Sequence, residues 1–378
     1  MKSNPDVIVV GGGIAGCAVA IELAVRGASV TLVEKNQPGV GATGASAGML
    51  APQYEAHAPD AAFHFSVASK EAFPAFAKHI QDLAAWKVGL RTDGMLVANR
   101  TAVEEEGALQ DLAFQAAVGL EGEILSVEEA QRIHGGVAAD VHSWLWLPLE
   151  AQVDTQRLAV GLADAVQEAG VTLVRGAPVT EITSEGGRVS GARLSDGRQI
   201  PGQRLVLAAG AWSAGINGLP RTLPVRPIRG QMLRLLPPKP LPWTLVCDHQ
   251  GRYLVPRING TVLVGSTMED VGFDDRVTEE GRGLLAEAAA SLIPSLGDAK
   301  IVEAWAGLRP ISADGLPILG PDPDMEGLFY AAGHGRNGIL YAPLVGRAVA
   351  ELVLEGSTEV PWEAFRIERF DSGARDAS

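Results

Sequence analysis

The pattern of apolar and polar residues is clearest at the start of the chain. A short run that is dense in β-branched residues, Val7–Val10, has the composition of a buried parallel strand. The Ala-rich apolar stretch from about Ile14 to Arg26 predicts a helix that ends at Gly27, and Ser29–Val33 predicts a second strand. The chain therefore opens with a strand, a helix and a strand, an order typical of a parallel α/β sheet.

The rest of the chain divides into stretches of helical periodicity and short apolar runs. Helices are expected within His57–Leu90, Ala102–Leu120, Ser126–His134, Val153–Gly170, Arg276–Leu292 and Ile339–Leu354. Short strands are expected at Gly94–Asn99, Thr172–Val174, Arg204–Ala208 and Leu328–Ala332, with a meander over Val179–Ile200. An antiparallel sheet is expected from Gln231–Leu235, Thr244–Asp248, Tyr253–Pro256 and Thr261–Ser266. Because the buried strands from the middle of the sequence return to the first sheet, we expect two interleaved domains.

Three glycines, Gly11, Gly13 and Gly16, stand in the turn between the first strand and the first helix. Gly11 permits a tight turn, Gly13 lets a pyrophosphate approach the backbone, and Gly16 lets the helix pack closely on the sheet. The positive end of the helix dipole then faces the phosphates. Glu34, at the end of the second strand, can accept hydrogen bonds from both ribose hydroxyls of an adenosine. This context favours a dinucleotide site over a glycine-rich turn without a ligand.

Two further glycine-rich segments are expected to meet the same ligand. Gly39–Pro52 is small and flexible, so Thr43, Ser46 and the backbone N–H groups through Met49 could reach a pyrophosphate or a ring system. The alternative for this stretch is a plain linker. Gly333–Gly338 again joins a strand to the start of a helix, and this second electropositive helix end can stabilise negative charge on a ligand.

Composition and charge exclude several classes of protein. The 378-residue chain has a formal net charge of −14, which argues against nucleic acid or an anionic membrane as its main partner. Its two cysteines, Cys17 and Cys247, are far apart, which fits a reducing, cytoplasmic compartment. No metal-ligand spacing is present, and no membrane span is expected, because the most apolar stretch would place three consecutive glycines and Glu22 in the hydrocarbon. The small polar tail Asp371–Ser378 is expected to be disordered.

Together these motifs resemble the FAD-dependent amine and D-amino-acid oxidase superfamily, and within it the glycine oxidases of the ThiO type. The resemblance covers nearly the whole chain and rests on Gly11–Glu34, Ala42–Met49, Tyr253–Arg257, Gly265–Met268, Gly307–Pro310 and Gly333–Gly338. It implies an α/β fold in which a Rossmann-like FAD-binding domain, a parallel sheet plus a β-meander, is interleaved with an antiparallel-sheet α+β substrate domain. The FAD-binding domain is expected at 1–55, 145–222 and 300–365, the substrate domain at 56–144 and 223–299, and a tail at 366–378.

The resemblance also implies roles for individual residues. Arg309 would hold the substrate carboxylate in a bidentate salt bridge, because a planar guanidinium fits a carboxylate, and Tyr253 would donate its hydroxyl to the same group. Arg336 would lie beside them, with Met49 and Met268 as pocket walls, although each could instead be an ordinary ion pair or core residue. FAD would contact Gly11, Gly13, Ile14, Ala15, Gly16, Glu34, Lys35, Ala42, Thr43, Ser46, Ala47, Gly48, Met49, Val179, Gly210, Trp212, His334, Gly335, Arg336, Asn337, Gly338, Ile339 and Leu340. The FAD is expected to be non-covalent, since no cysteine follows Cys247.

The implied activity is flavin-dependent oxidation of glycine and other small amino acids, such as sarcosine and small D-amino acids, to the 2-oxo acid, ammonia and hydrogen peroxide. The imine formed on the way would supply thiamine thiazole biosynthesis. The expected partners are a small amino acid and dioxygen, and a homo-oligomer is left open. Alternatives that also stay open are a D-amino-acid dehydrogenase that uses a quinone, a sarcosine oxidase and, more distantly, a non-catalytic binding protein with this fold.

Overall fold

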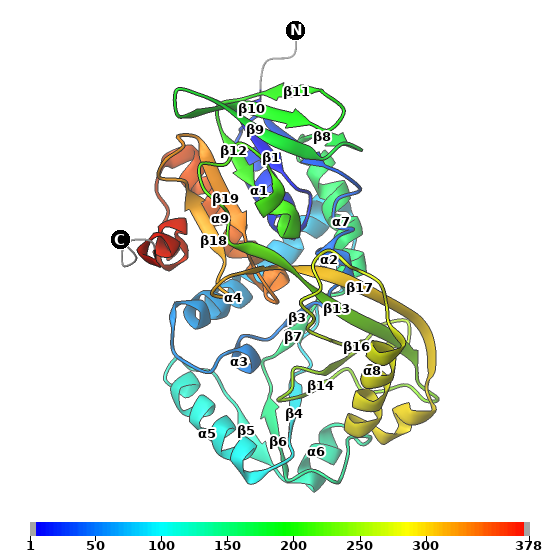
Figure 1. Cartoon of the computed structure of the whole chain (residues 1–378). Coiled ribbons are helices and arrows are strands. Elements are labelled where there is room, and N and C mark those ends of the chain that lie inside the picture. Colours follow the sequence, from blue (N-terminus) through cyan, green and yellow to red (C-terminus); the bar gives the residue numbers. More distant parts are fainter. Residues whose placement is uncertain (1–4, 374–378) are drawn as a thin grey trace.

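The computed structural model describes residues 5–373 of the chain. Two large sheets dominate this part of the chain, with a meander packed on one face of the smaller sheet and a two-stranded ribbon where the large sheets meet (Figure 1). None of the helices within residues 5–373 is long and apolar enough to cross a membrane.

The six-stranded sheet contains the predicted strand–helix–strand unit. Its strands, in spatial order, are β18 (Ile318–Pro321), β19 (Leu328–Ala332), β12 (Leu205–Leu207), β1 (Val7–Val10), β2 (Val30–Glu34) and β8 (Thr172–Arg175). All neighbouring pairs are parallel except the pair formed by the edge strand β18, which is antiparallel to β19. Segments from the beginning, middle and end of the chain thus share one sheet, which confirms the predicted interleaving.

Each face of this sheet is covered by a different layer. Because successive side chains alternate across a strand, Val7 and Val9 pack on one face and Ile8 and Val10 on the other. The first face is covered by α1 (Ile14–Val25), α4 (Ala61–Ala84), α7 (Thr155–Glu168) and α9 (Gly338–Glu355). The second is covered by the meander of β9 (Val179–Glu185), β10 (Arg188–Leu194) and β11 (Gln199–Pro201). Burial on both faces explains why these strands are almost continuously apolar.

The eight-stranded sheet forms the second domain. Its strands, in spatial order, are β17 (Lys300–Ser312), β13 (Val225–Leu236), β16 (Val262–Gly265), β15 (Tyr253–Pro256), β14 (Leu245–Asp248), β4 (Met95–Asn99), β6 (Ser143–Leu147) and β5 (Glu123–Leu125). Every pair is antiparallel except β14 with β4. Helices α6 (Val127–Ile133) and α8 (Glu279–Leu292) pack on one face, and α5 (Ala102–Ala116) lies beside β4 and β6. On the other face, Cys247 and Tyr253 pack with Ala47 and Ala51 from the N-terminal part of the chain.

Short elements occupy the region where the two sheets meet. They are α2 (Ala42–Ala45), β3 (Met49–Leu50), α3 (Pro52–Glu55), β7 (Ala151–Gln152) and the 3₁₀ helix η1 (Gly210–Gly215), with η2 (Pro294–Asp298), η3 (Glu363–Phe365) and η4 (Ile367–Gly373) elsewhere. β3 pairs with β7, and the hydroxyl of Thr155 donates to the carbonyl of Ser46 at 2.6 Å. The stretch 39–52, which was expected to be a flexible loop, is therefore held in place by the chain around it.

Two segments lie outside the domains expected for them. β17 was not predicted as a strand, yet it pairs with β13 along almost its whole length, which places 300–312 in the eight-stranded sheet. Helix α4 contributes Phe65 and Phe73 to the core shared with α1 and α9, so it belongs with the six-stranded sheet although the sequence placed it in the substrate domain. We therefore propose the predicted domain ranges with two changes, in which 300–312 moves to the substrate domain and α4 moves to the FAD-binding domain.

The C-terminal tail also departs from its prediction. Asp371 lies in η4, and its carboxylate pairs with Arg221 at 2.7 Å, so the expectation of disorder was wrong for Asp371. The tail residues 374–378 lie outside the described part of the chain.

Candidate active site

Two of the three motif glycines are required by the fold itself. Gly11 has φ +104°, and a Cβ there would lie 2.3 Å from the carbonyl oxygen of Ala208 at the end of β12. A Cβ at Gly16 would lie 1.8 Å from the carbonyl oxygen of Gly11, so the helix could not pack this closely on the strand. These positions keep the strand, the turn and α1 together whether or not a ligand is bound.

Gly13 is different, because nothing in the protein excludes a side chain there. It has an ordinary φ of −70°, and the nearest heavy atom to an added Cβ is Thr43 Oγ1 at 3.6 Å. Gly13 is the N-cap of α1 and supplies no side-chain cap, while the Ile14 N–H donates to Thr43 Oγ1 at 2.9 Å. The open space in front of an electropositive helix end fits a phosphate group.

Glu34 lies beside this turn, where the motif places it. Its two carboxylate oxygens accept hydrogen bonds from the backbone N–H groups of Gly12, at 2.7 Å, and Asn36, at 2.8 Å. A carboxylate has about four lone-pair sites, so the Glu34 oxygens retain acceptor capacity for ribose hydroxyls.

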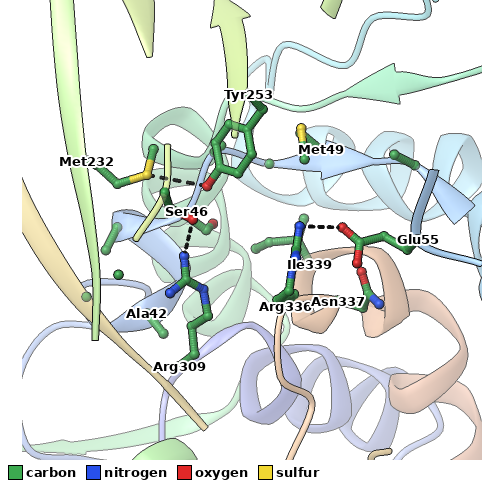
Figure 2. Close-up of a pocket in the computed structure, with 17 residues that line it drawn as sticks. Ala42, Ser46, Met49, Glu55, Met232, Tyr253, Arg309, Arg336, Asn337 and Ile339 are labelled. Atoms are coloured by element: carbon green, nitrogen blue, oxygen red, sulfur yellow. Dashed lines mark hydrogen bonds and ion pairs between the residues drawn. The ribbon is translucent and has the colours of Figure 1, made fainter. Parts of the chain in front are cut away.

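A pocket that is partly open to solvent lies where the two sheets meet. Of the residues expected at the site, it is lined by Ala42, Ser46, Ala47, Gly48, Met49, Tyr253, Arg309, Arg336, Asn337 and Ile339. These residues come from the 42–49 segment, from the strands β15 and β17, and from the turn before α9 together with the start of that helix (Figure 2). Four segments that are distant in the sequence therefore converge on one cavity.

Arg309 on β17 is the charged group of this pocket without a carboxylate partner. Its guanidinium donates to the carbonyl of Thr267 at 3.1 Å and to the hydroxyl of Ser266. Within residues 5–373 no Asp or Glu oxygen lies within 4.0 Å of its nitrogens. Burial lowers the pKa of Arg309 from its usual value, which reflects the cost of holding an uncompensated charge there.

The backbone of β13 makes room for this guanidinium. Gly230 lies on β13, two residues after the residue that pairs with Arg309 in the antiparallel register of β13 and β17. A Cβ at Gly230 would lie only 2.0 Å from Arg309 Nη1. A glycine in the interior of a strand weakens the sheet, and it often marks a place where another group needs the space that a side chain would fill. The absence of a side chain at Gly230 therefore makes room for the Arg309 guanidinium in the pocket and is not needed by the fold itself.

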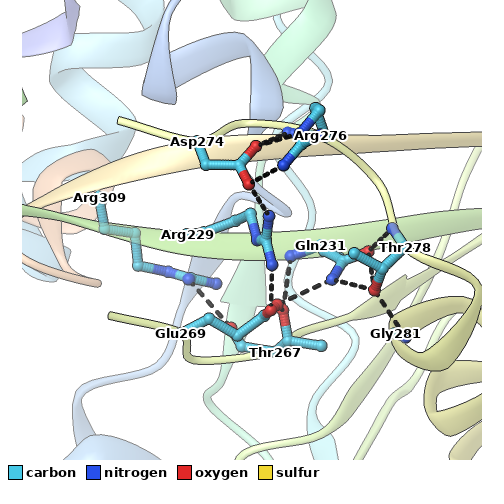
Figure 3. A network of polar contacts seen from close by, with 9 residues as sticks. All are labelled: Arg229, Gln231, Thr267, Glu269, Asp274, Arg276, Thr278, Gly281 and Arg309. Carbon is cyan, nitrogen blue, oxygen red and sulfur yellow. Dashed lines mark hydrogen bonds and ion pairs between the residues drawn. The ribbon is translucent and has the colours of Figure 1, made fainter. Parts of the chain in front are cut away.

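A polar network holds the segment that carries the acceptors of Arg309 (Figure 3). Thr267 Oγ1 accepts from the Gln231 N–H at 2.8 Å and donates to Glu269, and Gln231 Nε2 also donates to Glu269 at 2.8 Å. The buried Arg229 pairs with the Glu269 carboxylate and lies 3.3 Å from that of Asp274. The network fixes the Thr267 carbonyl and with it the direction of the Arg309 side chain.

Tyr253 and Arg336 complete the polar part of the pocket. The Tyr253 hydroxyl, on a side chain only 7% exposed, donates to Met232 Sδ at 3.4 Å, and it faces the Arg309 guanidinium (Figure 2). A thioether is a weak hydrogen-bond acceptor, so the Tyr253 hydroxyl is able to rotate and donate to a stronger acceptor. Arg336 pairs with Glu55 at 2.9 Å between Nη2 and Oε1.

Met268, expected as a pocket wall, does not line the pocket and is 52% exposed. Its neighbour Thr267 points into the polar network, so the next side chain along this extended segment points outward. The methionine beside Tyr253 is Met232 on β13, which is 2% exposed. The structure therefore does not bring Met268 into this pocket, and it places there Met232, which was not predicted.

Several other residues expected to contact the cofactor lie outside the pocket lining. Lys35 Nζ lies 3.0 Å from the centroid of the Trp212 ring, and burial lowers the pKa of Lys35. Gly210 has φ +57°, and Val179 is buried at the start of β9. Of the turn before α9, Gly335 donates its N–H to the carbonyl of Pro310 at 2.9 Å, Gly338 begins the helix, and Leu340 is buried.

His334, in the same turn, has an unusual environment. It is 6% exposed, and burial lowers its pKa to about 4, so the imidazole is neutral. Its Nε2 has no hydrogen-bond partner among the described residues. Such an orphaned buried group is rare in proteins. With the open Gly13 turn and the α9 N-terminus, which lacks a side-chain cap, it fits a large polar cofactor along this edge of the sheet.

Comparison with known proteins decides the family. The family described as FAD dependent oxidoreductase matches residues 6–352. The chain belongs to this family. It is an FAD-dependent oxidoreductase, and FAD is its cofactor. In the described residues, no three His, Cys, Asp or Glu side chains are grouped so that they could hold a metal ion.

Three relatives of this FAD-dependent oxidoreductase are informative. Glycine oxidase of Geobacillus kaustophilus (strain HTA426) is 34% identical over 372 residues, 98% of each chain. A crystal structure of glycine oxidase from that species has a TM-score of 0.92 at 33% identity, covering 97% of this chain and 99% of that one. The bifunctional protein ThiO/ThiG of Trichormus variabilis is 34% identical over 98% of this chain, which spans 56% of that protein. Iminodiacetate oxidase from Chelativorans sp. BNC1 has a TM-score of 0.87 at 30% identity, covering 95% and 98%.

Seven residues of the pocket lining were not predicted as site residues: Ala45, Ala51, Glu55, Gly230, Met232, Ser266 and Gly307. Ala45, Ser266 and Gly307 lie within motifs that carry the family resemblance, whereas Ala51, Glu55, Gly230 and Met232 lie outside those motifs. Gly230 carries a weak signal, because a glycine inside an apolar strand pattern indicates close approach by another group. The other three residues outside the motifs carry no local signal, because their positions depend on which strands lie side by side.

Proposed function

We propose that this enzyme oxidises glycine and other small amino acids, including sarcosine and small D-amino acids, to the 2-oxo acid, ammonia and hydrogen peroxide. The observation that carries the proposal is the Arg309 guanidinium, which faces the pocket without a carboxylate partner and beside the Tyr253 hydroxyl. Similarity to glycine oxidase over the full length of the chain supports the same substrate class.

Arg309 and Tyr253 would bind the substrate carboxylate. A guanidinium presents parallel N–H donors that match the two oxygens of a carboxylate, and the Tyr253 O–H would exchange its thioether acceptor for a charged oxygen. Thr267 and Ser266 hold the guanidinium from behind. The amino acid is thereby oriented by its carboxylate, and its α-carbon is directed into the pocket.

FAD supplies a two-electron acceptor when it is bound, and the protein supplies its seat and the orientation of the substrate. We assign the diphosphate to the turn of Gly11, Gly13 and Gly16, and the ribose of the adenosine to Glu34. The residues assigned to the rest of the cofactor are Ile14, Ala15, Lys35, Ala42, Thr43, Ser46, Ala47, Gly48, Met49, Val179, Gly210, Trp212, His334, Gly335, Arg336, Asn337, Gly338, Ile339 and Leu340. The N-terminus of α9 would favour negative charge on the ring system.

The pocket offers no side chain to remove a proton from the substrate amine. Among its described lining residues Glu55 is the one carboxylate, and it is paired with Arg336, while histidine is absent from the lining. The substrate therefore has to enter with a neutral amine. We expect kcat/KM to rise with pH as the substrate ammonium group loses its proton.

We further propose that the imine product serves thiamine thiazole synthesis in the cytoplasm. The match to the ThiO/ThiG protein supports this role, and two unpaired, buried cysteines, Cys17 and Cys247, fit a reducing compartment. To test this role, the enzyme is expressed in a strain that lacks this step of thiazole synthesis. We expect the wild type to restore growth without added thiazole, and equal growth with an Arg309→Ala variant would contradict the proposal.

The decisive experiment is anaerobic bleaching of the bound flavin by glycine, sarcosine and D-alanine, followed by readmission of air. We expect bleaching by all three and rapid return of the yellow colour with peroxide. Bleaching without reoxidation by air would indicate a dehydrogenase, and bleaching by sarcosine alone would indicate a sarcosine oxidase. No bleaching by any of them would refute the proposal.

A further inference from the structure

We propose that Glu55 restricts the enzyme to substrates with a single carboxylate, because it neutralises Arg336 and leaves Arg309 as the one guanidinium free to bind an anion. This inference rests on the proposed function and adds a determinant of substrate charge. Its consequence is that loss of the Glu55 charge opens the pocket to amines that carry two carboxylates.

The pocket contains two guanidinium groups with opposite surroundings. Arg309 has hydrogen-bond acceptors but no carboxylate within 4.0 Å in the described chain, whereas Arg336 Nη2 lies 2.9 Å from Glu55 Oε1 (Figure 2). Both members of the ion pair line the cavity, and their side chains are 32% and 18% exposed. The pair is therefore part of the pocket wall, where water screens it less than it would a surface pair.

Glu55 is held in position by its own short helix. The buried Glu150 carboxylate accepts from the backbone N–H groups of Gln53, at 2.8 Å, and Tyr54, at 3.3 Å. The Tyr54 hydroxyl donates to the carbonyl of Asp248 at 2.7 Å. Three hydrogen bonds thus tie α3 to the turn before β7 and to the end of β14, which fixes the backbone from which the Glu55 side chain reaches the cavity.

Arg336 is confined from the other side. The turn between β14 and β15 carries Gly251, and a Cβ there would lie 3.2 Å from Arg336 Nη1. This turn begins at Asp248, the residue that anchors Tyr54. The positions of both members of the ion pair therefore depend on one turn, which keeps the Glu55 carboxylate on the Arg336 guanidinium.

The charge balance predicts the selectivity. Glycine and sarcosine bring one carboxylate, which Arg309 neutralises. An amine with a second carboxylate, such as iminodiacetate or D-aspartate, would bring it into a cavity where Arg336 is already neutralised and where Glu55 repels it. A like charge within a few ångströms in a partly desolvated site weakens binding by about tenfold or more.

The test uses two anions that the enzyme cannot oxidise and that differ by one carboxylate. Methoxyacetate has the shape of sarcosine, and diglycolate has the shape of iminodiacetate, with an ether oxygen in place of the amine. Their dissociation constants are measured by calorimetry on the FAD-containing wild type, on Glu55→Gln and on Glu55→Ala. Glu106→Gln, an equal change of charge on exposed α5, is the matched control.

We expect both Glu55 variants to shift the preference toward diglycolate by about tenfold or more, with Glu106→Gln unchanged. Adding Arg336→Met to Glu55→Gln should remove most of that gain. An unchanged preference in Glu55 variants that keep their flavin spectrum and Tm overturns the inference. So does a gain that persists without Arg336. Because neither anion is oxidised, these outcomes are independent of flavin bleaching by glycine, on which the proposed function depends.

Discussion

Gly230→Ala is the substitution for which the structure makes the sharpest prediction. The added methyl carbon would lie 2.0 Å from Arg309 Nη1 and 2.3 Å from Nη2, about 1.4 Å closer than the 3.4 Å at which ordinary contact begins. The backbone of Gly230 does not need a positive φ, so alanine fits the strand. The clash falls on the end of a flexible side chain, and we therefore expect the protein to fold and bind FAD while Arg309 moves.

A displacement of about 1 Å in a substrate-positioning group costs roughly 100-fold in rate. We therefore expect kcat/KM for glycine to fall by about 100-fold, equivalent to about 2.7 kcal/mol of transition-state stabilisation. The assay is peroxide production over a range of glycine concentrations. Methoxyacetate binding should weaken in parallel, because the same guanidinium holds both carboxylates.

Gly283→Ala is the matched control, because Gly283 lies on the exposed side of α8 and an added Cβ meets nothing within 4 Å. It should leave kcat/KM unchanged and raise stability slightly, since alanine is the better helix former. If Gly230→Ala retained wild-type kcat/KM with FAD bound, Arg309 would not be the carboxylate-binding group in the position described here.

Three further predictions concern single side chains. Arg309→Ala should raise KM for glycine by roughly 50-fold, with partial recovery in Arg309→Lys, because a buried carboxylate loses its charge partner; an unchanged KM would refute the assignment. The pKa of His334 is about 4 in the folded protein against 6.5 for an ordinary histidine. As pH falls, the unfolded chain therefore binds a proton first, and about 2 kcal/mol of unfolding free energy should be lost between about pH 7.5 and 5. Urea titrations of the wild type and His334→Asn check this, and equal slopes in both would contradict it. Met232→Ala should destabilise the protein by about 2–5 kcal/mol, whereas exposed Met268→Ala should stay within about 0.5 kcal/mol; thermal melts that reverse this order would contradict the pocket wall described above.

The nucleotide turn was predictable because its parts lie close together in the chain. Val7–Val10, the glycines at 11, 13 and 16, and Glu34 fall within one strand–helix–strand unit, and local sterics and periodicity determine how that unit folds. The structure separates the roles of these glycines. Gly11 and Gly16 avoid clashes with protein atoms, whereas Gly13 leaves space that the protein does not fill.

The longest strand was missed for a physical reason. β17 has mostly half-buried and exposed side chains, so it lacks the alternation that marks a strand with one buried face. Its stability comes from pairing with β13, some 75 residues earlier in the chain. The same pairing places Gly230 beneath Arg309, and the register of the segment after β16 turns Met268 outward and leaves Met232 beside Tyr253.

The sequence by itself determined the βαβ unit, the dinucleotide motif, the fold class and the identity of Arg309 and Tyr253 as candidates, because each depends on residue type, short spacing or resemblance. Only the tertiary structure decided which domain α4 joins, that Glu55 pairs with Arg336, and that Arg309 lacks a carboxylate partner. Those facts depend on strand order, register and side-chain direction. A shift of one residue in register reverses the face of every side chain, and no local pattern encodes it.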